Sequence, residues 1–365
     1  MLDPPGDVRA LFDPAPHSIY LDAATYGLPP RPTVDAMHQS IDSWQAGRAN
    51  WISDWDQSGE RCRASFAELI GTDSSTIALL PTVSVGVGTI AASLEPGDEV
   101  ITPDDEFTSV LFPLLVQQQA RGVTVRTVPL ERLAQAIEPG STRLVAFSLI
   151  QMHSARAAAL PEVVAAARSA GACTLVDASH AVPFVPLADQ IDHIDYLVCA
   201  AYKHLLCPRG VAFMHVARER WDDVQPLVAN WRSSSDPYGA YFGGPLDLAP
   251  TAARFDVSLA WFSWLGGSVS LELLVDWQRR GLLEPVVGLA RRFAAQLALP
   301  EPLGTVVSVP TGDAESVRAQ LAEAGIKAAV RANSVRFSTH LWNTADQVDR
   351  AARAIAPLVQ VPVAT

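Results

Sequence analysis

The stretch YLVCAAYKHLLCPRGVAFMHV, residues 196–216, contains two apolar runs on either side of a single lysine, Lys203. Short apolar runs bounded by turn residues are typical of buried strands. The lysine directly follows the first run, so we expect it at the carboxyl edge of a sheet, where open α/β sheets bind ligands. The alternative is a lysine that extends from a surface loop into solvent.

Five further runs of the same kind precede this stretch and alternate with segments of helical period. One such segment, LPEVVAAARSAG at 160–171, has apolar residues at helical spacing and ends in glycine, as capped helices do. Alternating strands and helices are typical of βα units around a parallel sheet. The sequence therefore predicts an α/β fold with a mostly parallel seven-stranded sheet. The predicted strands are residues 76–82, 98–103, 123–129, 142–150, 173–178, 196–201 and 210–216.

The C-terminal part has a different pattern. Residues 218–260 are rich in Ser, Gly, Pro and Tyr and show no period, so we expect a long loop that is functional or forms an interface. A long helical pattern follows at 261–283. We expect a large domain at 1–260, whose segment 1–30 packs near the active site or the small domain, and a smaller α+β domain at 261–365. Its further elements are expected at residues 305–310, 313–325, 328–332, 334–340 and 344–358.

The composition excludes several classes of protein. The chain has 365 residues, 49% of them hydrophobic, and its 39 acidic and 27 basic side chains give a formal charge of −12. This balance excludes disorder and offers no basic face to nucleic acid. No apolar run reaches the ~18 residues of a membrane span, and the N-terminus lacks a signal-peptide pattern. We expect a soluble, cytoplasmic protein long enough to be an enzyme.

Four cysteines are scattered along the chain without a CxxC pair. This spacing favours neither a disulfide framework nor a zinc site. All four fall in or beside expected strands or a helix, so we expect unreactive core thiols in a reducing cytoplasm and no metal centre. They are Cys62, Cys173, Cys199 and Cys207.

A carboxylate stands near Lys203 in the predicted sheet. Asp177, in LVDASHA at 175–181, ends the strand before that of Lys203, and a charge in so apolar a run faces solvent or has a partner. Pyridoxal phosphate (PLP) chemistry requires such a pair, because the lysine forms a Schiff base and the carboxylate keeps the pyridine nitrogen protonated. The pair could equally form a structural ion bridge, so a third feature is needed.

That feature is a candidate phosphate site. The segment LLPTVSVGVGT, residues 79–89, passes from a strand through a turn into a helix, whose first N–H groups and dipole attract anions. Val83 and Ser84 offer backbone N–H groups, and the hydroxyls of Thr82 and Ser84 add further donors. A structural N-cap is the alternative.

With these motifs in order, the chain resembles the class V aminotransferase family of fold type I PLP enzymes. This group contains cysteine desulfurases, selenocysteine lyases, kynureninases and isopenicillin N epimerase-like proteins. The resemblance runs from YLDAATYGLPP at 20–30, similar to the family's "YLDNAA" opening, to VRFSTHLWNT at 335–344, similar to its "R-x-S-x-x-x-YNT" signature. It implies PLP as the cofactor, an amino-acid substrate and a homodimer with active sites near the interface.

The resemblance also implies roles for single residues. Lys203 matches the Schiff-base lysine, preceded by Tyr202 where many members have histidine, and Asp177 matches the pyridinium partner. His180 matches a polar residue beside the cofactor. Phe107, in DEFTSVLFP at 105–113, matches the ring stacked on the pyridine; desulfurases have histidine there, whereas epimerase-like members share the "EF-x-S" form. Gln151 is similar to the residue near the cofactor's phenolic oxygen.

Further matches concern the substrate and the dimer. Arg336 matches the arginine that binds the substrate α-carboxylate, to which a planar guanidinium is suited; an edge-strand arginine in solvent is the alternative. In ARFDVSLAW, residues 253–261, Ser258 is the candidate that reaches the partner's phosphate, and Trp261 is a candidate for lining the pocket. Ala200 stands where many relatives have a hydroxyl residue that contacts phosphate.

These parts predict an enzyme that transforms an α-amino acid at Cα or Cβ. Residues 300–340 contain no cysteine, which disfavours desulfurization through a persulfide on the enzyme. Transamination or deamination, or carbon–sulfur β-elimination of a cysteine-derived substrate in amino-acid or secondary metabolism, is the first hypothesis. An isopenicillin N epimerase-like epimerase and a non-catalytic PLP-binding protein are the alternatives.

Overall fold

A seven-stranded sheet forms the centre of the chain, of which the computed structural model describes residues 3–331 and 333–360. Its order is β2-β8-β7-β6-β5-β3-β4, and only β8 runs antiparallel to its neighbours. The strands are β2 (Ile77–Leu80), β3 (Glu99–Pro103), β4 (Thr124–Val128), β5 (Thr142–Ser148), β6 (Cys173–Asp177), β7 (Tyr196–Ala200) and β8 (Ala212–Val216). The predicted α/β class and the mostly parallel seven-stranded sheet are therefore confirmed.

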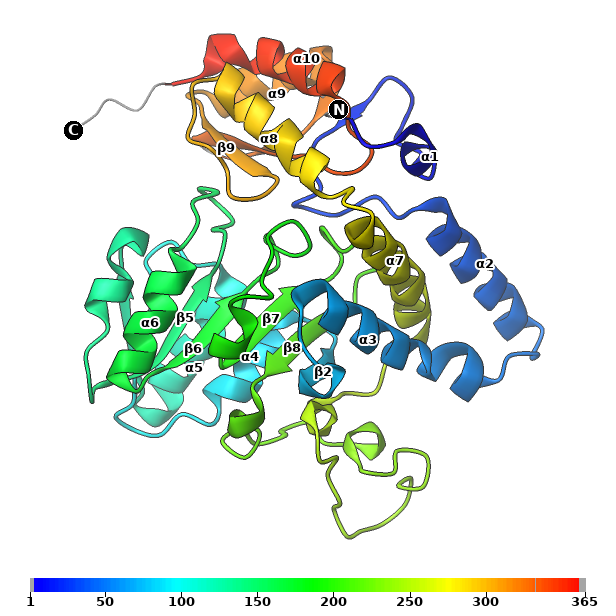
Figure 1. Ribbon diagram of the computed structural model, residues 1–365, viewed down its shortest axis with the longest axis vertical. Helices are drawn as coiled ribbons and strands as arrows, with labels where there is room; N and C mark the ends of the chain where they lie inside the picture. The colour runs from blue at the N-terminus through cyan, green and yellow to red at the C-terminus, as the bar shows by residue number, and fades with distance from the viewer. Residues whose placement is uncertain (1–2, 332, 361–365) are drawn as a thin grey trace.

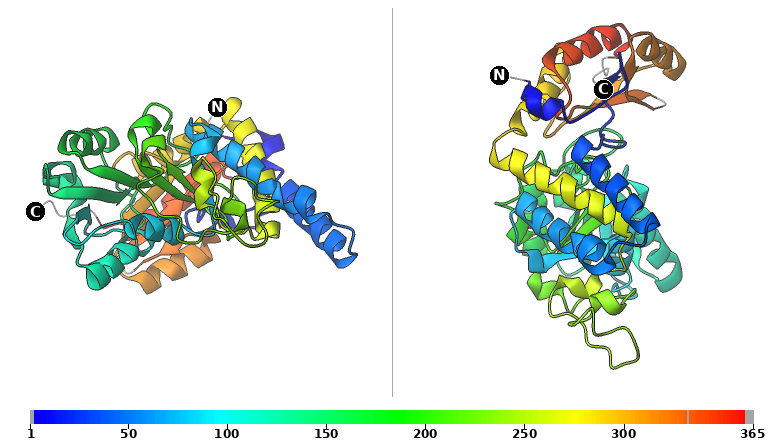
Figure 2. Two further views of the ribbon diagram at one scale, coloured as in Figure 1. Left: turned by 90° about the horizontal axis from the view of Figure 1, so that it is seen from below. Right: turned by 90° about the vertical axis from the view of Figure 1, so that its right-hand side faces the viewer.

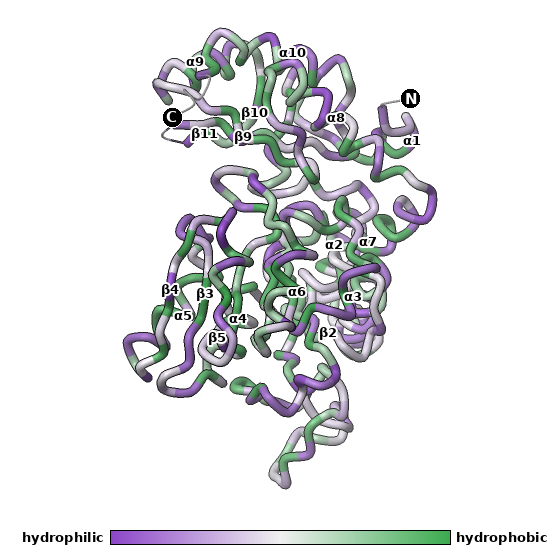
Figure 3. Tube along the Cα trace, turned by 60° about the vertical axis from the view of Figure 1, so that its left-hand side comes forward, coloured by the Kyte–Doolittle hydropathy of each residue, from purple (hydrophilic) through white to green (hydrophobic). Residues whose placement is uncertain are grey.

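Both faces of the sheet are buried. Successive residues of a strand point to opposite faces, and in β2 Ile77 and Leu79 join one apolar cluster while Ala78 and Leu80 join the other. Helices cover each face (Figure 1), and the hydrophobic stretches of the Cα trace lie mainly inside this layered body (Figure 3). Burial on both faces explains why these strands read as continuous apolar runs.

The helices surround the sheet and fill the C-terminal part. They are α1 (Gly6–Arg9), α2 (Arg31–Gln45), α3 (Ser58–Ile70), α4 (Val83–Ala91), α5 (Thr108–Arg121), α6 (Leu160–Ala170), α7 (Trp261–Arg279), α8 (Glu284–Gln296), α9 (Ala314–Glu323) and α10 (Ala345–Ile355). A π-helix, η1, spans Trp51–Asp56. Short 3-10 helices are η2 (Ser74–Thr76), η3 (Leu130–Arg132), η4 (Ala134–Ala136), η5 (Ile191–His193), η6 (Arg218–Arg220), η7 (Trp231–Ser233), η8 (Ala252–Phe255) and η9 (Ala356–Leu358).

A second, smaller core lies beyond one end of the large sheet (Figures 1 and 2). Helices α8, α9 and α10 pack there on an antiparallel sheet of order β11-β12-β9. Its strands are β9 (Val306–Pro310), β11 (Ala329–Val330) and β12 (Ser334–Ser338). This arrangement has the α+β character expected of the C-terminal part.

The structure differs from the expected boundaries in three places. Helix α7 ends at Arg279, because Gly281 follows with a positive φ of 70°. The strand expected at 328–332 is reduced to β11, and residue 332 lies outside the described residues. A further strand, β10 (Ile326–Lys327), was not expected from the sequence pattern; it pairs in parallel with β1 (Ile19–Tyr20). This pairing fastens the N-terminal segment to the small domain.

We propose that the boundary between the two domains follows α7 rather than preceding it at residue 260. Leu271, Leu274 and Trp277 of α7 belong to the apolar cluster of the large sheet, whereas Leu289 and Phe293 of α8 belong to the small one. The helix therefore shares its core with the large domain.

The segment expected to be a long loop is fixed at its base by buried ion pairs. Arg63 binds Asp256 at 2.5 Å and Arg232 binds Asp56, and the side chains of all four are less than 8% exposed. Asp256 also accepts a hydrogen bond from the backbone N–H of Leu79 at 2.8 Å, which ties the segment to β2. Beyond this base, residues 234–250 project from the body on the side opposite the small domain (Figure 2).

Candidate active site

A cavity opens at the carboxyl ends of β6 and β7, the edge where the sequence places its candidate residues. Six of the predicted residues line it together: Thr82, Val83, Ser84, Phe107, Asp177 and Lys203. Its remaining wall is formed by Pro81, Ser109, Ser179, Ala200, Tyr202, Arg209, Val211 and Ala212. The structure thus brings together four segments that are as far apart in the sequence as Thr82 and Lys203.

Asp177 is the last residue of β6 and lies opposite Val198 of β7. Its carboxylate is 6% exposed and accepts a hydrogen bond from the backbone N–H of Ser179 at 2.8 Å. Burial raises the pKa of Asp177, whereas the charge of Lys203 and the bond from Ser179 lower it. The carboxylate is therefore fixed in position at the cavity wall.

Lys203 follows β7 by three residues and is 7% exposed. Its Nζ lies 3.1 Å from Nε2 of His180 and forms no direct ion pair with Asp177. Burial lowers the pKa of Lys203 to about 8; the charge of Asp177 opposes this shift and that of Arg336 adds to it. Because Lys203 and Asp177 are not joined, the structure does not support a structural ion bridge, and both remain free to bind a ligand.

The number of lysines in the chain also points to Lys203, although no motif is needed to see it. The chain contains two lysines, Lys203 and Lys327. Lys327 lies in β10 and is exposed, so it is in the wrong setting for a buried Schiff base. Of these two lysines, Lys203 is therefore the one that is buried and lies on the wall of the cavity.

The candidate phosphate site lies at the start of α4. Thr82 precedes the helix in extended conformation, and its hydroxyl lies 3.1 Å from that of Ser84. The first N–H groups of a helix, here those of Val83 and Ser84, have no partner within the helix. The turn can therefore offer backbone and hydroxyl donors to an anion.

Phe107 is held beside Lys203 by a buried carboxylate that the sequence analysis overlooked. Nζ of Lys203 lies 5.6 Å from the centre of the Phe107 ring. Glu106 accepts bonds from the Phe107 backbone N–H at 2.8 Å, from the Ser148 N–H at 2.7 Å and from Gln151 Nε2 at 3.0 Å. Gln151 is buried against Glu106 and does not line the cavity, so its placement near the phenolic oxygen stays a prediction.

Arg336 lies in β12 and is 2% exposed, so it is not the solvent-exposed edge arginine of the alternative reading. Its Nη2 donates to the hydroxyl of Thr25 at 2.9 Å and its Nη1 to the carbonyl of Met152 at 3.3 Å, while Nε has no partner among the described residues. Burial and nearby Arg331 lower the pKa of Arg336 to about 10, which leaves it cationic near neutral pH. A buried guanidinium with a spare N–H is suited to a carboxylate.

Ser258 and Trp261 do not line this cavity. Ser258 is exposed, and the Trp261 ring stacks between those of Trp51 and Trp55 at centroid distances of 5.3 and 5.4 Å. Its Nε1 donates to Asp56 at 3.3 Å. The role predicted for Ser258 involves a partner chain; that role and the pocket-lining role predicted for Trp261 remain predictions.

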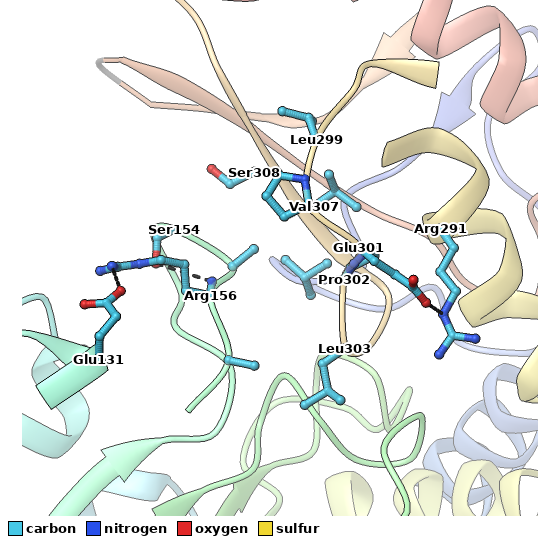
Figure 4. Close-up of a pocket in the computed structure, with 14 residues that line it drawn as sticks. Glu131, Ser154, Arg156, Arg291, Leu299, Glu301, Pro302, Leu303, Val307 and Ser308 are labelled. Carbon is cyan, nitrogen blue, oxygen red and sulfur yellow. Dashed lines mark hydrogen bonds and ion pairs between the residues drawn. The ribbon is translucent and has the colours of Figure 1, made fainter. Parts of the chain in front are cut away.

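A larger cleft, of about 610 Å³, lies between the two domains but contains no candidate catalytic residue (Figure 4). Its two arginines are already paired: Arg156 binds Glu131, and Arg291 binds Glu301 at 2.9 Å. Its other walls are mainly apolar, from residues 299–307. The smaller cavity around Lys203 therefore remains the candidate active site.

Neither the cysteines nor the potential metal ligands form a competing site in the part of the chain that the structure describes. All four cysteines are buried, and burial raises their pKa, which keeps the thiols protonated. Within the described ranges no group of three or more His, Cys, Asp or Glu side chains is arranged for a metal ion.

Among the helices of the described residues, none is both long and apolar enough to cross a bilayer.

The fold and the cavity define a class of protein, the PLP-dependent enzymes of fold type I. The model for "Aminotransferase class-V" matches residues 19–230. The chain belongs to the class V aminotransferase family, and PLP is its cofactor.

Characterised relatives have different activities. Isopenicillin N epimerase from Streptomyces clavuligerus is 28% identical over an alignment of 346 positions, gaps included, which covers 82% of this chain and 84% of the relative. Kynureninase from Deinococcus radiodurans is 28% identical over an alignment of 393 positions, gaps included, which covers 98% of this chain and 94% of the relative. The family is therefore shared, whereas the reaction differs between relatives.

Solved structures confirm the fold. A C-DES mutant with glycine covalently linked to its PLP superposes with a TM-score of 0.84 at 20% identity, covering 96% of this chain and 99% of that one. The cystine C–S lyase C-DES in complex with cysteine persulfide superposes with a TM-score of 0.80 at 19% identity, covering 93% of this chain and 98% of that one. At these identities the superpositions establish architecture alone.

The residues present fit the cofactor. Lys203 offers an amine of lowered pKa, Asp177 a buried acceptor for a protonated ring nitrogen, and Phe107 a ring beside them. The turn at Thr82–Ser84 offers donors to the phosphate. When bound, the cofactor supplies a ring that withdraws electrons from the carbon next to the substrate nitrogen.

The lowered pKa of Lys203 predicts how cofactor attachment depends on pH. Only the neutral amine attacks an aldehyde, so attachment of PLP to cofactor-free protein should speed up as pH rises through about 8 and level off above it. Asp177→Asn removes a charge that raises this pKa, so the midpoint should move to lower pH. Stopped-flow absorbance measures the rate, with N-acetyl-lysine amide as the solution control. A midpoint near the ordinary 10.5, or an upward shift in Asp177→Asn, contradicts the assignment.

Arg336→Ala should weaken binding of amino acids that change the cofactor's absorbance. Loss of a buried charged partner costs about 2–5 kcal/mol, which corresponds to roughly 30-fold or more in Kd. Arg336→Lys keeps the charge but loses the planar fork, and should recover part of the affinity. Spectral titration of the holoprotein measures both variants. Titration curves that coincide with those of the parent protein would remove Arg336 from the substrate site.

Proposed function

We propose that the chain is an enzyme that transforms an α-amino acid at Cα or Cβ, with carbon–sulfur β-elimination of a cysteine-derived substrate, or transamination or deamination, as its reaction. The observation that carries this proposal is the placement of the Lys203 amine and the Asp177 carboxylate, unpaired with one another, on the wall of one cavity. Because the chain has both Lys203 and Asp177, a non-catalytic PLP-binding protein is disfavoured.

Each residue has a separate task in this proposal. Arg336 binds the substrate α-carboxylate through its fork, including the unpartnered Nε. Lys203, once released from the cofactor, takes the proton from Cα onto Nζ, for which a pKa of about 8 is suited. Asp177 would keep the cofactor's ring nitrogen protonated, and Phe107 would pack against the cofactor's ring. With the Cα proton removed, a thiolate on Cβ can leave.

Two observations favour β-elimination. One of the superposed structures is named a cystine C–S lyase, and its complex contains cysteine persulfide. This chain has no cysteine between residues 300 and 340, where desulfurases of the resembled family have a nucleophile. Carbon–sulfur cleavage that does not involve an enzyme thiol fits both.

Epimerization is the second candidate. Phe107 gives the chain the "EF-x-S" form of epimerase-like members, and a relative that matches 82% of this chain is named isopenicillin N epimerase. In this reaction the proton taken by Lys203 returns to the opposite face of Cα. The donor on that face would come from residues outside the set described above.

We further propose a cytoplasmic homodimer. Trp261 belongs to a cluster of aromatic rings from η1, η7 and the projecting segment, and Phe242 of that segment is 96% exposed. Such an apolar projection is typical of an interface. In such a dimer, Ser258 is the residue that the family resemblance assigns to the partner's phosphate.

Product analysis decides among the reactions. Incubated with a panel of amino acids and cysteine S-conjugates, the holoprotein should release keto acid, ammonia and thiol in equal amounts from an S-conjugate. Transamination would give keto acid without free ammonia. Epimerization would give the opposite enantiomer of the amino acid, with neither keto acid nor ammonia. Lys203→Ala is the inactive control and Lys327→Ala the matched active one. Absence of turnover on every substrate, with PLP bound, would support a binding protein instead.

A further inference from the structure

The charged side chains on the wall of the Lys203 cavity are three: Asp177, Lys203 and Arg209. The first two are assigned to the ring nitrogen and to the covalent link. A phosphate ester brings up to two negative charges, and the hydroxyls and N–H groups of the Thr82–Ser84 turn carry no net charge. Ala200, on the same wall, offers the phosphate no donor from its side chain. Arg209 is therefore the remaining source of positive charge.

Strand pairing places Arg209 at the phosphate end of the cavity. In the antiparallel pair β2–β8, Leu80 lies opposite Ala212. Residues that precede Ala212 therefore run beside residues that follow Leu80, which brings the Arg209–Val211 segment alongside the Pro81–Val83 turn. Asp177 ends β6, two strands away from β8 in the sheet.

The side chain of Arg209 is held in place but not neutralised. Its guanidinium carbon lies 5.1 Å from the centre of the Tyr202 ring, and its backbone carbonyl accepts a bond from the Ser263 hydroxyl at 2.9 Å. It forms no ion pair with any carboxylate in residues 3–331 and 333–360, whereas Arg63 and Arg232, at the base of the 218–260 segment, do. The ring orients the cation while leaving its N–H fork available.

We propose that Arg209, oriented by Tyr202, binds the phosphate group of the cofactor opposite the Thr82–Ser84 turn. This inference rests on the proposed placement of the phosphate at that turn. Arg209 supplies the charge that a neutral turn lacks, and its planar fork matches two phosphate oxygens. The site would then distinguish PLP from pyridoxal chiefly through this residue.

The test compares two cofactors that differ only in the phosphate. Cofactor-free protein is titrated with PLP and with pyridoxal, and loss of PLP from the holoprotein is followed by dialysis. Arg209→Ala should weaken PLP binding about tenfold, the low end for a charged hydrogen bond, because Arg209 is exposed and water screens its charge. Its affinity for pyridoxal should be unchanged, which also shows that the variant is folded. Arg209→Lys should recover part of the PLP affinity.

Arg218 provides a matched control. Its guanidinium also lies over an aromatic ring, that of Trp221 at 5.6 Å, but it is not on the cavity wall. Arg218→Ala should bind both cofactors as the parent protein does.

Each outcome decides a separate point. If Arg209→Ala binds PLP like the parent protein, or loses PLP and pyridoxal equally, the role of Arg209 is overturned. If the double variant Thr82→Val/Ser84→Ala also leaves the preference for PLP over pyridoxal unchanged, the placement of the phosphate is wrong. A parent protein that binds neither cofactor would overturn the proposed function itself.

Discussion

Two opposite charges buried close together at the edge of an apolar sheet determine the character of this site. Lys203 is 7% exposed and Asp177 is 6% exposed, and removing an ion from water costs several kcal/mol unless its charge is compensated. The two compensate each other only through space, since no direct ion pair joins them. Burial consequently lowers the pKa of the lysine and raises that of the carboxylate, and both groups remain available to a ligand between them.

The substrate side of the site depends on the small domain and the N-terminal segment. The backbone N–H of Ala24 donates to the hydroxyl of Ser338 in β12 at 2.7 Å. Arg336, two residues before Ser338 in β12, donates from Nη2 to the hydroxyl of Thr25. On its other side the segment meets the lysine loop, where the Gly27 N–H donates to the Tyr202 carbonyl at 2.9 Å. A Cβ at Gly27 would lie 2.2 Å from the Lys203 carbonyl, so glycine is required by this approach. One short segment therefore aligns Arg336 with Lys203.

Features that follow from local pattern were predictable from the sequence. The seven strands are apolar because both faces of the sheet are covered, and strand ends indicate where Asp177 and Lys203 lie. Features that depend on cross-strand register were not predictable. Arg209 reads as a loop cation until the β2–β8 pairing puts it beside the phosphate turn. Glu106 reads as a surface carboxylate until it is seen buried among donors from β5, and β10 is too short to show a period.

Covalent binding of the cofactor by Lys203 is tested most directly by borohydride reduction. The purified holoprotein is reduced, digested and mapped by mass spectrometry, with two lysines in the chain to distinguish. We expect a pyridoxyl phosphate adduct on the peptide that contains Lys203, none on the peptide that contains Lys327, and none in Lys203→Ala. An adduct on Lys327, or one that persists in Lys203→Ala, would contradict covalent attachment at Lys203.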